Sequence, residues 1–78
     1  MPVLRLFASA REAAGTGREV VPGSTVAQLL ANAVERHGVQ FGAVLATCRV
    51  WVNGEEVDPA TALSEGDEVA VLPPVSGG

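Results

Sequence analysis

The chain has 78 residues, enough for one small domain and too few for a second hydrophobic core. Hydrophobic residues make up 47% of it and charged residues 18%, a composition that excludes an intrinsically disordered protein. The net charge is −4 and the five basic residues are all arginines, scattered along the chain, so we expect no nucleic-acid partner.

Cysteine and histidine each occur once, as Cys48 and His37. A single cysteine excludes an internal disulfide and suits a reducing compartment, and the two residues are too few for a metal site built from cysteine or histidine. No apolar run approaches the roughly 20 residues of a membrane span, and no secretory signal opens the chain. We therefore expect a soluble, cytoplasmic domain that has no metal site and no membrane partner.

Two short apolar segments, Val3–Ala8 and Arg18–Val21, predict β-strands, and residues 9–17 between them predict a polar connection. In the first strand the two leucines alternate with Arg5, which marks its own face as the solvent side. Phe7 shares that face with Arg5. The exposure of an apolar side chain at this position calls for an explanation.

Residues Ser24–His37 predict the one helix of the chain. Thr25 followed by Gln28 has the spacing of a capping box, and Gly38 is placed to end the helix. Five apolar residues recur at helical spacing and predict a buried stripe. They are Val26, Leu29, Leu30, Ala33 and Val34.

The second half of the chain predicts an irregular segment and three further strands. Residues Val39–Thr47 have no clear periodicity, although we expect Phe41 to pack under the sheet. The Asn-Gly pair at 53–54 is typical of a tight hairpin between strands Arg49–Asn53 and Glu55–Val57. Asp67–Leu72 predicts the last strand. This order of elements predicts an α+β fold with a mixed sheet and one main helix packed across it.

Residues 1–72 thus form the predicted domain, and residues 73–78 are predicted to be an extended tail that ends in Gly-Gly. Pro73 and Pro74 end sheet pairing, and six extended residues reach roughly 19 Å, far enough to enter a cleft of another protein. Gly77 and Gly78 lack side chains, so a narrow channel can admit them. The alternative is a frayed end with no role.

Four segments of the chain also resemble a known family. They are Leu6-Phe7-Ala8 with Arg11-Glu12-Ala13-Ala14-Gly15, then Val52-Asn53-Gly54, then Leu63-Ser64-Glu65-Gly66-Asp67-Glu68-Val69, and finally Pro73-Pro74-Val75-Ser76-Gly77-Gly78. With these segments the whole chain resembles the MoaD/ThiS family of ubiquitin-like sulfur carriers, which have the β-grasp fold. Its opening and its ending are most similar to those of the molybdopterin synthase small subunits within that family.

The resemblance implies a non-catalytic carrier whose reactive group is the C-terminal carboxylate of Gly78. A ubiquitin-activating-type adenylyltransferase would adenylate Gly78 with ATP, and a sulfur donor protein would then convert it to a thiocarboxylate. The large synthase subunit would receive the tail, and the sulfur would build the dithiolene of molybdopterin in a heterotetramer. This chain would bind no cofactor itself.

The resemblance also assigns residues to the partner interface. The tail residues that would thread into the partner are Pro73, Pro74, Val75, Ser76 and Gly77. Phe7 and Leu72 match positions where the family places apolar contacts to the large subunit. Glu56 departs from the pattern, because some members carry an apolar residue there.

For several other residues a structural role has to be weighed against a functional one. Cys48 could relay persulfide sulfur, but a lone cysteine before a strand is more often a small core residue. His37 is expected to be solvated at a helix end, and Trp51 to pack, with partner contact as the lesser alternative. Six of the nine acidic residues fall between Glu55 and Glu68, where they form solvated turns or complement a basic partner surface.

Three function classes remain open from the sequence. The first is the molybdopterin sulfur carrier. The second is a carrier for another pathway, such as thiamin, cysteine or tRNA thiolation, or a protein modifier attached to target lysines. The third is a β-grasp interaction module whose tail does nothing. Because the chain contains no lysine, it cannot itself be extended into lysine-linked polymers.

Overall fold

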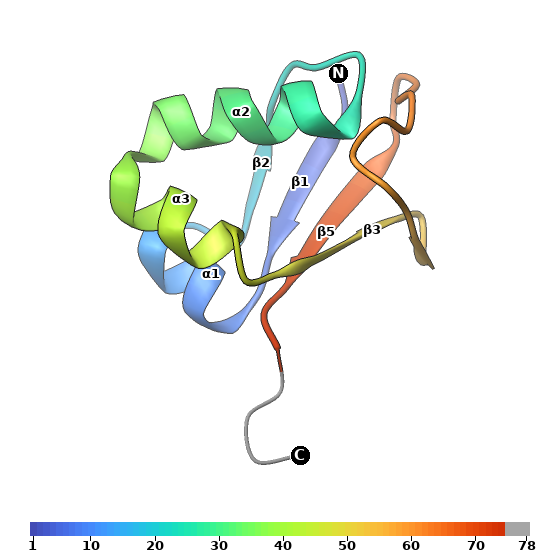
Figure 1. The fold of residues 1–78 in the computed structure, drawn as a ribbon. Helices are drawn as coiled ribbons and strands as arrows, with labels where there is room; N and C mark the ends of the chain where they lie inside the picture. Colours follow the sequence, from blue (N-terminus) through green and yellow to red (C-terminus); the bar gives the residue numbers. More distant parts are fainter. Residues whose placement is uncertain (75–78) are drawn as a thin grey trace.

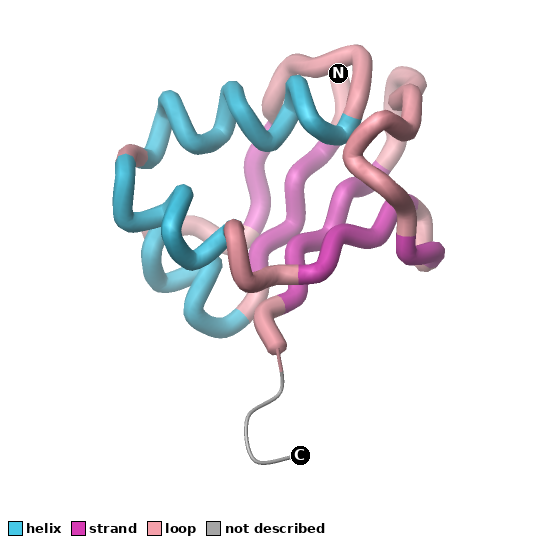
Figure 2. The backbone as a smooth tube through the Cα atoms, viewed as in Figure 1, coloured by secondary structure: helices cyan, strands magenta, loops and turns pink. Residues whose placement is uncertain are grey.

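The computed structural model describes residues 1–74, and in it a five-stranded mixed sheet is covered on one face by helices (Figures 1 and 2). The sheet has the order β2-β1-β5-β3-β4. Its strands are β1 Val3–Leu6, β2 Arg18–Val20, β3 Arg49–Val52, β4 Glu55–Glu56 and β5 Glu68–Leu72. The central pair, β1 and β5, is parallel, and the other pairs are antiparallel. The predicted mixed sheet is confirmed.

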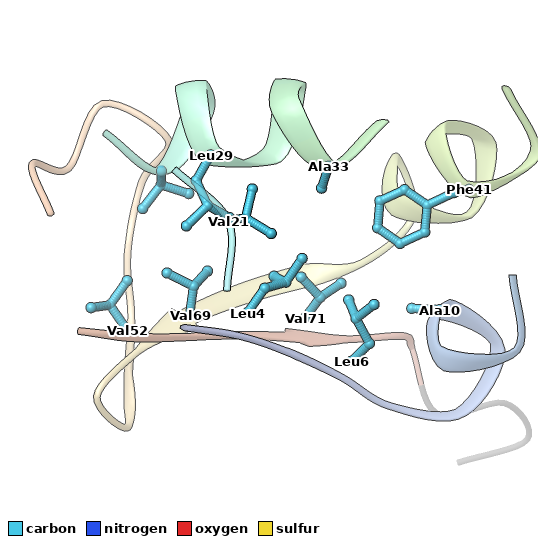
Figure 3. Close-up of a cluster of buried hydrophobic side chains, with 11 residues drawn as sticks. Leu4, Leu6, Ala10, Val21, Leu29, Ala33, Phe41, Val52, Val69 and Val71 are labelled. Atoms are coloured by element: carbon cyan, nitrogen blue, oxygen red, sulfur yellow. The ribbon is translucent and has the colours of Figure 1, made fainter. Parts of the chain in front are cut away.

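The main helix is α2, Val26–His37, which crosses the inner face of the sheet (Figure 3). Thr25 Oγ1 accepts the Gln28 N–H at 3.1 Å, which is one half of the predicted capping box. The other half differs, since Gln28 Oε1 accepts the N–H of Ser24 at 2.6 Å instead of that of Thr25. None of the helices within residues 1–74 has the length and apolar character needed to cross a membrane.

Two short helices were not predicted from the sequence. Helix α1, Ala8–Ala14, lies in the expected connection, and helix α3, Val39–Leu45, lies in the expected irregular segment. Both have seven residues, a length at which intrinsic propensity does not sustain a helix, so packing decides. Figure 1 shows them side by side at one end of the sheet. There Ala10 of α1 and Phe41 of α3 are fully buried, so Phe41 packs in the core as expected.

The first strand is shorter than predicted. It ends at Leu6, and Phe7 has extended backbone as the residue before helix α1. Helix α1 ends at Gly15, whose φ of +77° favours glycine and whose N–H bonds to the carbonyl of Arg11. Gly15, which lies in the segment expected to be a polar connection, therefore marks the end of a helix.

The core lies between the sheet and the helices (Figure 3), and its alternating strand residues confirm the predicted faces. The buried apolar residues are Leu4, Leu6, Ala10, Val21, Val26, Leu29, Ala33, Phe41, Val52, Val69 and Val71. Two residues of the predicted stripe, Leu30 and Val34, are only half-buried at its edge. Both still pack against the core, and Val34 lies beside Gly42 of α3.

The hairpin between β3 and β4 turns at Asn53 and Gly54, whose φ angles of +50° and +87° are those of the predicted tight turn. Asn53 also joins this hairpin to the start of β5. Its Oδ1 accepts the N–H of Glu68 at 3.0 Å, and its Nδ2 donates to Asp67 at 3.0 Å. The turn is thus held to the central strand.

We predict that Leu29→Ala lowers the free energy of unfolding by about 2–5 kcal/mol, because it leaves a cavity in the centre of the core. Leu30→Ala is the matched control on the same helix and should cost clearly less, since Leu30 is half-buried. Urea unfolding followed by circular dichroism measures both. A loss at Leu30 as large as that at Leu29 would contradict the core described above.

The stability of the fold should also depend on the carboxylate of Asp67. The N–H of Ser64 and the Asn53 side chain donate to this carboxylate and hold its pKa below the ordinary value. A lowered native pKa stabilises the fold above the unfolded pKa, and this stabilisation is lost as the pH falls from about 4 through the native pKa. Asp67→Asn should therefore flatten the dependence of Tm on pH in this range.

Glu55→Gln is the control for this measurement, because Glu55 is an exposed carboxylate in the neighbouring hairpin. It should leave the acid dependence of Tm close to that of the wild type. An Asp67→Asn variant with an unchanged slope would refute the role of Asp67.

Candidate functional site

The predicted partner-binding residues lie on the outer face of the sheet, at the end where β1 and β5 stop. Leu6 pairs with Val71, so Phe7 and Leu72 each follow the last pair of the two parallel strands. Phe7 is 36% exposed and Leu72 is half-buried. The sheet register therefore brings together two residues that are 65 positions apart in the sequence.

Strand β3 contributes further residues to this face. Arg49 pairs with Leu72, and Trp51 pairs with Ala70. Residues paired in register point to the same side of a sheet, so these side chains flank the end of β5. We call this surface the outer face and define it by six residues. They are Arg5, Phe7, Arg49, Trp51, Ala70 and Leu72.

The position of Trp51 corrects a prediction. We expected a packing role, but Trp51 is absent from the core and from the apolar residues packed against it. Its neighbours Val50 and Val52 point inward instead, opposite Val71 and Val69. Trp51 is instead half-buried on the outer face.

Two ion pairs lie among these apolar side chains. Arg5 Nη1 is 3.5 Å from Glu68 Oε1, and the Arg5 guanidinium lies 5.6 Å from the centroid of the Phe7 ring. Arg49 Nη1 is 3.1 Å from Glu56 Oε2. Glu56, which departs from the family pattern, thus has a partner on the adjacent strand.

The tail begins directly at this face. Pro73 is half-buried and Pro74 is exposed, and both follow the last residue of β5 (Figure 1). The other predicted tail residues lie outside the described residues. They are Val75, Ser76, Gly77 and Gly78. The part of the tail that is described leaves the sheet beside Phe7 and Leu72, the two residues assigned to partner contact.

Cys48 has the environment of a core residue. It is half-buried against the core, and its Sγ lies 3.2 Å from the carbonyl oxygen of Val44, to which the thiol donates. Burial raises the pKa of the thiol and outweighs a hydrogen bond with Thr47 that lowers it. Because the thiolate is the nucleophilic form, this environment disfavours a persulfide relay and supports the structural interpretation.

His37 is not solvated as expected. Its Nε2 contacts the carboxylate of Glu19 on β2, and its ring lies 5.2 Å from that of Phe41 at an angle of 59°. Arg36 Nη1 bonds to the same carboxylate at 2.6 Å. The two basic residues at the end of α2 therefore fasten the helix to the edge of the sheet, which is a structural role.

The acidic cluster mostly organises turns. Glu65 pairs with the amino group of Met1 at 2.5 Å, and this contact lowers the pKa of its carboxyl. Asp58 Oδ1 accepts the N–H of Ala60 at 2.7 Å. Within residues 1–74, no three His, Cys, Asp or Glu side chains gather as a set of metal ligands. These contacts favour the interpretation as solvated turns for Asp58 and Glu65, whereas Glu56 and Glu68 lie in strands and pair with arginines.

The comparisons with known proteins cover nearly the whole chain. Residues 4–78 match the ThiS family. The molybdopterin synthase sulfur carrier subunit of Chlamydomonas reinhardtii is 40% identical in an alignment of 77 positions, which covers 92% of this chain and 92% of that one.

Two solved structures share the fold. Small archaeal modifier protein 1 from Haloferax volcanii is 33% identical with a TM-score of 0.78, over 99% of this chain and 98% of that one. A complex of subunits 1 and 2 of molybdopterin-converting factor from Helicobacter pylori contains a chain that is 23% identical with a TM-score of 0.73, over 99% and 97%. With these neighbours the predicted β-grasp fold is confirmed.

Proposed function

Because the chain belongs to the ThiS family, we propose that it is a sulfur carrier and that it serves as the small subunit of molybdopterin synthase. The observation that carries this proposal is its 40% identity with a molybdopterin synthase sulfur carrier subunit over nearly the full length of both chains. The family match extends through Gly77 and Gly78, the residues on which the proposed chemistry depends.

The proposed chemistry takes place on the carboxylate of Gly78. Oxide is a poor leaving group, so a free carboxylate does not transfer its acyl group. In the proposed reaction a carboxylate oxygen attacks the α-phosphorus of ATP, which is bound by an adenylyltransferase, and pyrophosphate leaves. Sulfide, or the outer sulfur of a persulfide on a donor protein, then attacks the acyl carbon and AMP leaves, so a C–S bond replaces a C–O bond. Where the nucleophile is a persulfide, a thiol then reduces the resulting acyl disulfide, which releases the thiocarboxylate and leaves a disulfide on the donor.

The outer face supports a docking role in this scheme. Phe7 and Leu72 lie where the chain leaves the sheet, so a partner that covers them is placed to receive residues 73–78. Glycine lacks Cβ, which suits Gly77 to a narrow channel. We infer that the catalytic groups belong to the partners and that this chain supplies the sulfur and the docking surface.

A protein modifier is the second candidate function. It is favoured by the structural neighbour from Haloferax volcanii, which is called a small archaeal modifier protein and is 33% identical. In that case a target lysine amine would attack the adenylated carboxyl and form an isopeptide bond. Modified target proteins that carry this chain would support this alternative.

The first functional prediction concerns Gly78. Deletion of Gly78, or addition of one residue after it, should abolish adenylation by the cognate adenylyltransferase, because the reactive carboxylate is missing or displaced. ATP–pyrophosphate exchange measures this step. The Tm should stay at the wild-type value, because the core formed by the described residues 1–74 has all its members before Pro73. Full activity of the extended chain without trimming would contradict the assignment of Gly78.

The second functional prediction concerns Phe7. Phe7→Asp should weaken binding to the large synthase subunit by several kcal/mol, because docking would desolvate a carboxylate on an apolar surface. Val39→Asp is the matched control, since Val39 is 89% exposed at the start of α3. Calorimetry measures affinity and circular dichroism the fold. Unchanged affinity of the Phe7 variant would remove this residue from the interface.

A further inference from the structure

The charged side chains on the outer face are ordered along the direction of the strands. Arg49 pairs with Leu72, the residue at the end where the tail begins. Glu56 pairs with Trp51, which in turn pairs with Ala70, two residues farther from the tail. Along β3 and β4 the charge is therefore positive near the tail, at Arg49, and negative farther from it, at Glu56 beside the outer face.

The second ion pair has the same direction. Arg5 pairs in register with Ala70, whereas its ionic partner Glu68 lies at the far end of β5, opposite Val3. Both arginines of the outer face are thus nearer to the tail than the carboxylates that they contact. Two independent pairs on neighbouring strands share one polarity.

These ion pairs add little to the stability of the fold, and they leave N–H donors of Arg49 available for hydrogen bonds with a partner. The Arg49 side chain is 71% exposed and that of Glu56 is 46% exposed, and such exposed pairs are worth little stability. The contacts of Arg49 to Glu56 both use Nη1, at 3.1 and 3.2 Å, although a guanidinium has five N–H donors. Its other donors are available to a docked protein.

When a partner docks, the two arginine–carboxylate pairs would discriminate between partners of different charge. The apolar side chains between the pairs, Trp51, Ala70 and Leu72, favour close contact with a partner, and close contact removes water from the arginines and carboxylates. A guanidinium that loses water without gaining an acceptor is costly, and a like charge opposite it is costlier. A partner that merely offers apolar surface is therefore disfavoured.

We propose that the Arg49–Glu56 pair, supported by Arg5–Glu68, selects the partner by charge. The large synthase subunit that fits this face carries a carboxylate beside the entrance of the channel that takes the tail, and a basic side chain farther away, opposite Glu56. This inference rests on the proposed function and adds to it the charge pattern of the partner. It makes Arg49 and Glu56 determinants of specificity beside the apolar contacts.

The test is the exchange R49E/E56R, which keeps the net charge and the possibility of an internal pair but reverses the polarity. Its affinity for the purified large synthase subunit of the same organism, measured by calorimetry, should be lower by about tenfold or more. Added salt should weaken wild-type binding and narrow the difference, because it screens both the attraction and the repulsion. E35Q/Q40E, which moves one charge between two exposed positions outside the sheet, should bind like the wild type.

A second variant, R49Q/E56Q, tests the inference even if R49E/E56R is less stable than the wild type. It removes the charges without placing like charges together, and it should bind less tightly than the wild type and more tightly than R49E/E56R. Wild-type affinity of both folded variants would overturn this inference and leave the proposed function standing. If the wild-type chain itself did not bind the large subunit, the proposed function would fail together with the inference.

Discussion

The parallel pairing of β1 with β5 sets both the core of the sheet and the arrangement of its outer face. These strands come from the two ends of the described chain, and their register places Leu4 beside Val69 and Leu6 beside Val71, all buried. A shift of one residue would turn these side chains outward, so burial of the inner face fixes the register. The same register determines which residues meet at the end of β5.

Because of this pairing, the residues that stabilise the fold and the residues proposed for partner contact lie on opposite faces of the sheet. The inner face and helix α2 form the core, whereas the outer face contributes no residue to it. Substitutions on the outer face can therefore alter recognition with little cost in stability.

Local patterns predicted the parts of the fold that depend on short-range chemistry. The capping residue Thr25, the turn at Asn53 and the alternation in β5 each have a physical cause within a few residues. Helices α1 and α3 were missed because their stability comes from packing around Ala10 and Phe41, which sequence spacing does not reveal.

In the candidate site, too, the sequence predicted what depends on local alternation and missed what depends on strand pairing. The outward position of Phe7 followed from its sharing a strand face with Arg5, and the family resemblance added Leu72. Trp51 was misplaced because Val50, Trp51 and Val52 are all apolar, so alternation alone does not say which of them points inward. That choice is made by pairing with β5, and the polarity of the Arg49–Glu56 pair becomes visible only with the same register.

Mass spectrometry of the intact chain from its native host shows whether Gly78 carries sulfur. We expect a species heavier than the unmodified chain by the difference between sulfur and oxygen, with fragmentation placing the substitution on the carboxyl of Gly78. Loss of the adenylyltransferase from the host should remove this species. A chain that carries only a free carboxylate while the host makes molybdopterin, or only isopeptide-linked forms, would contradict the account.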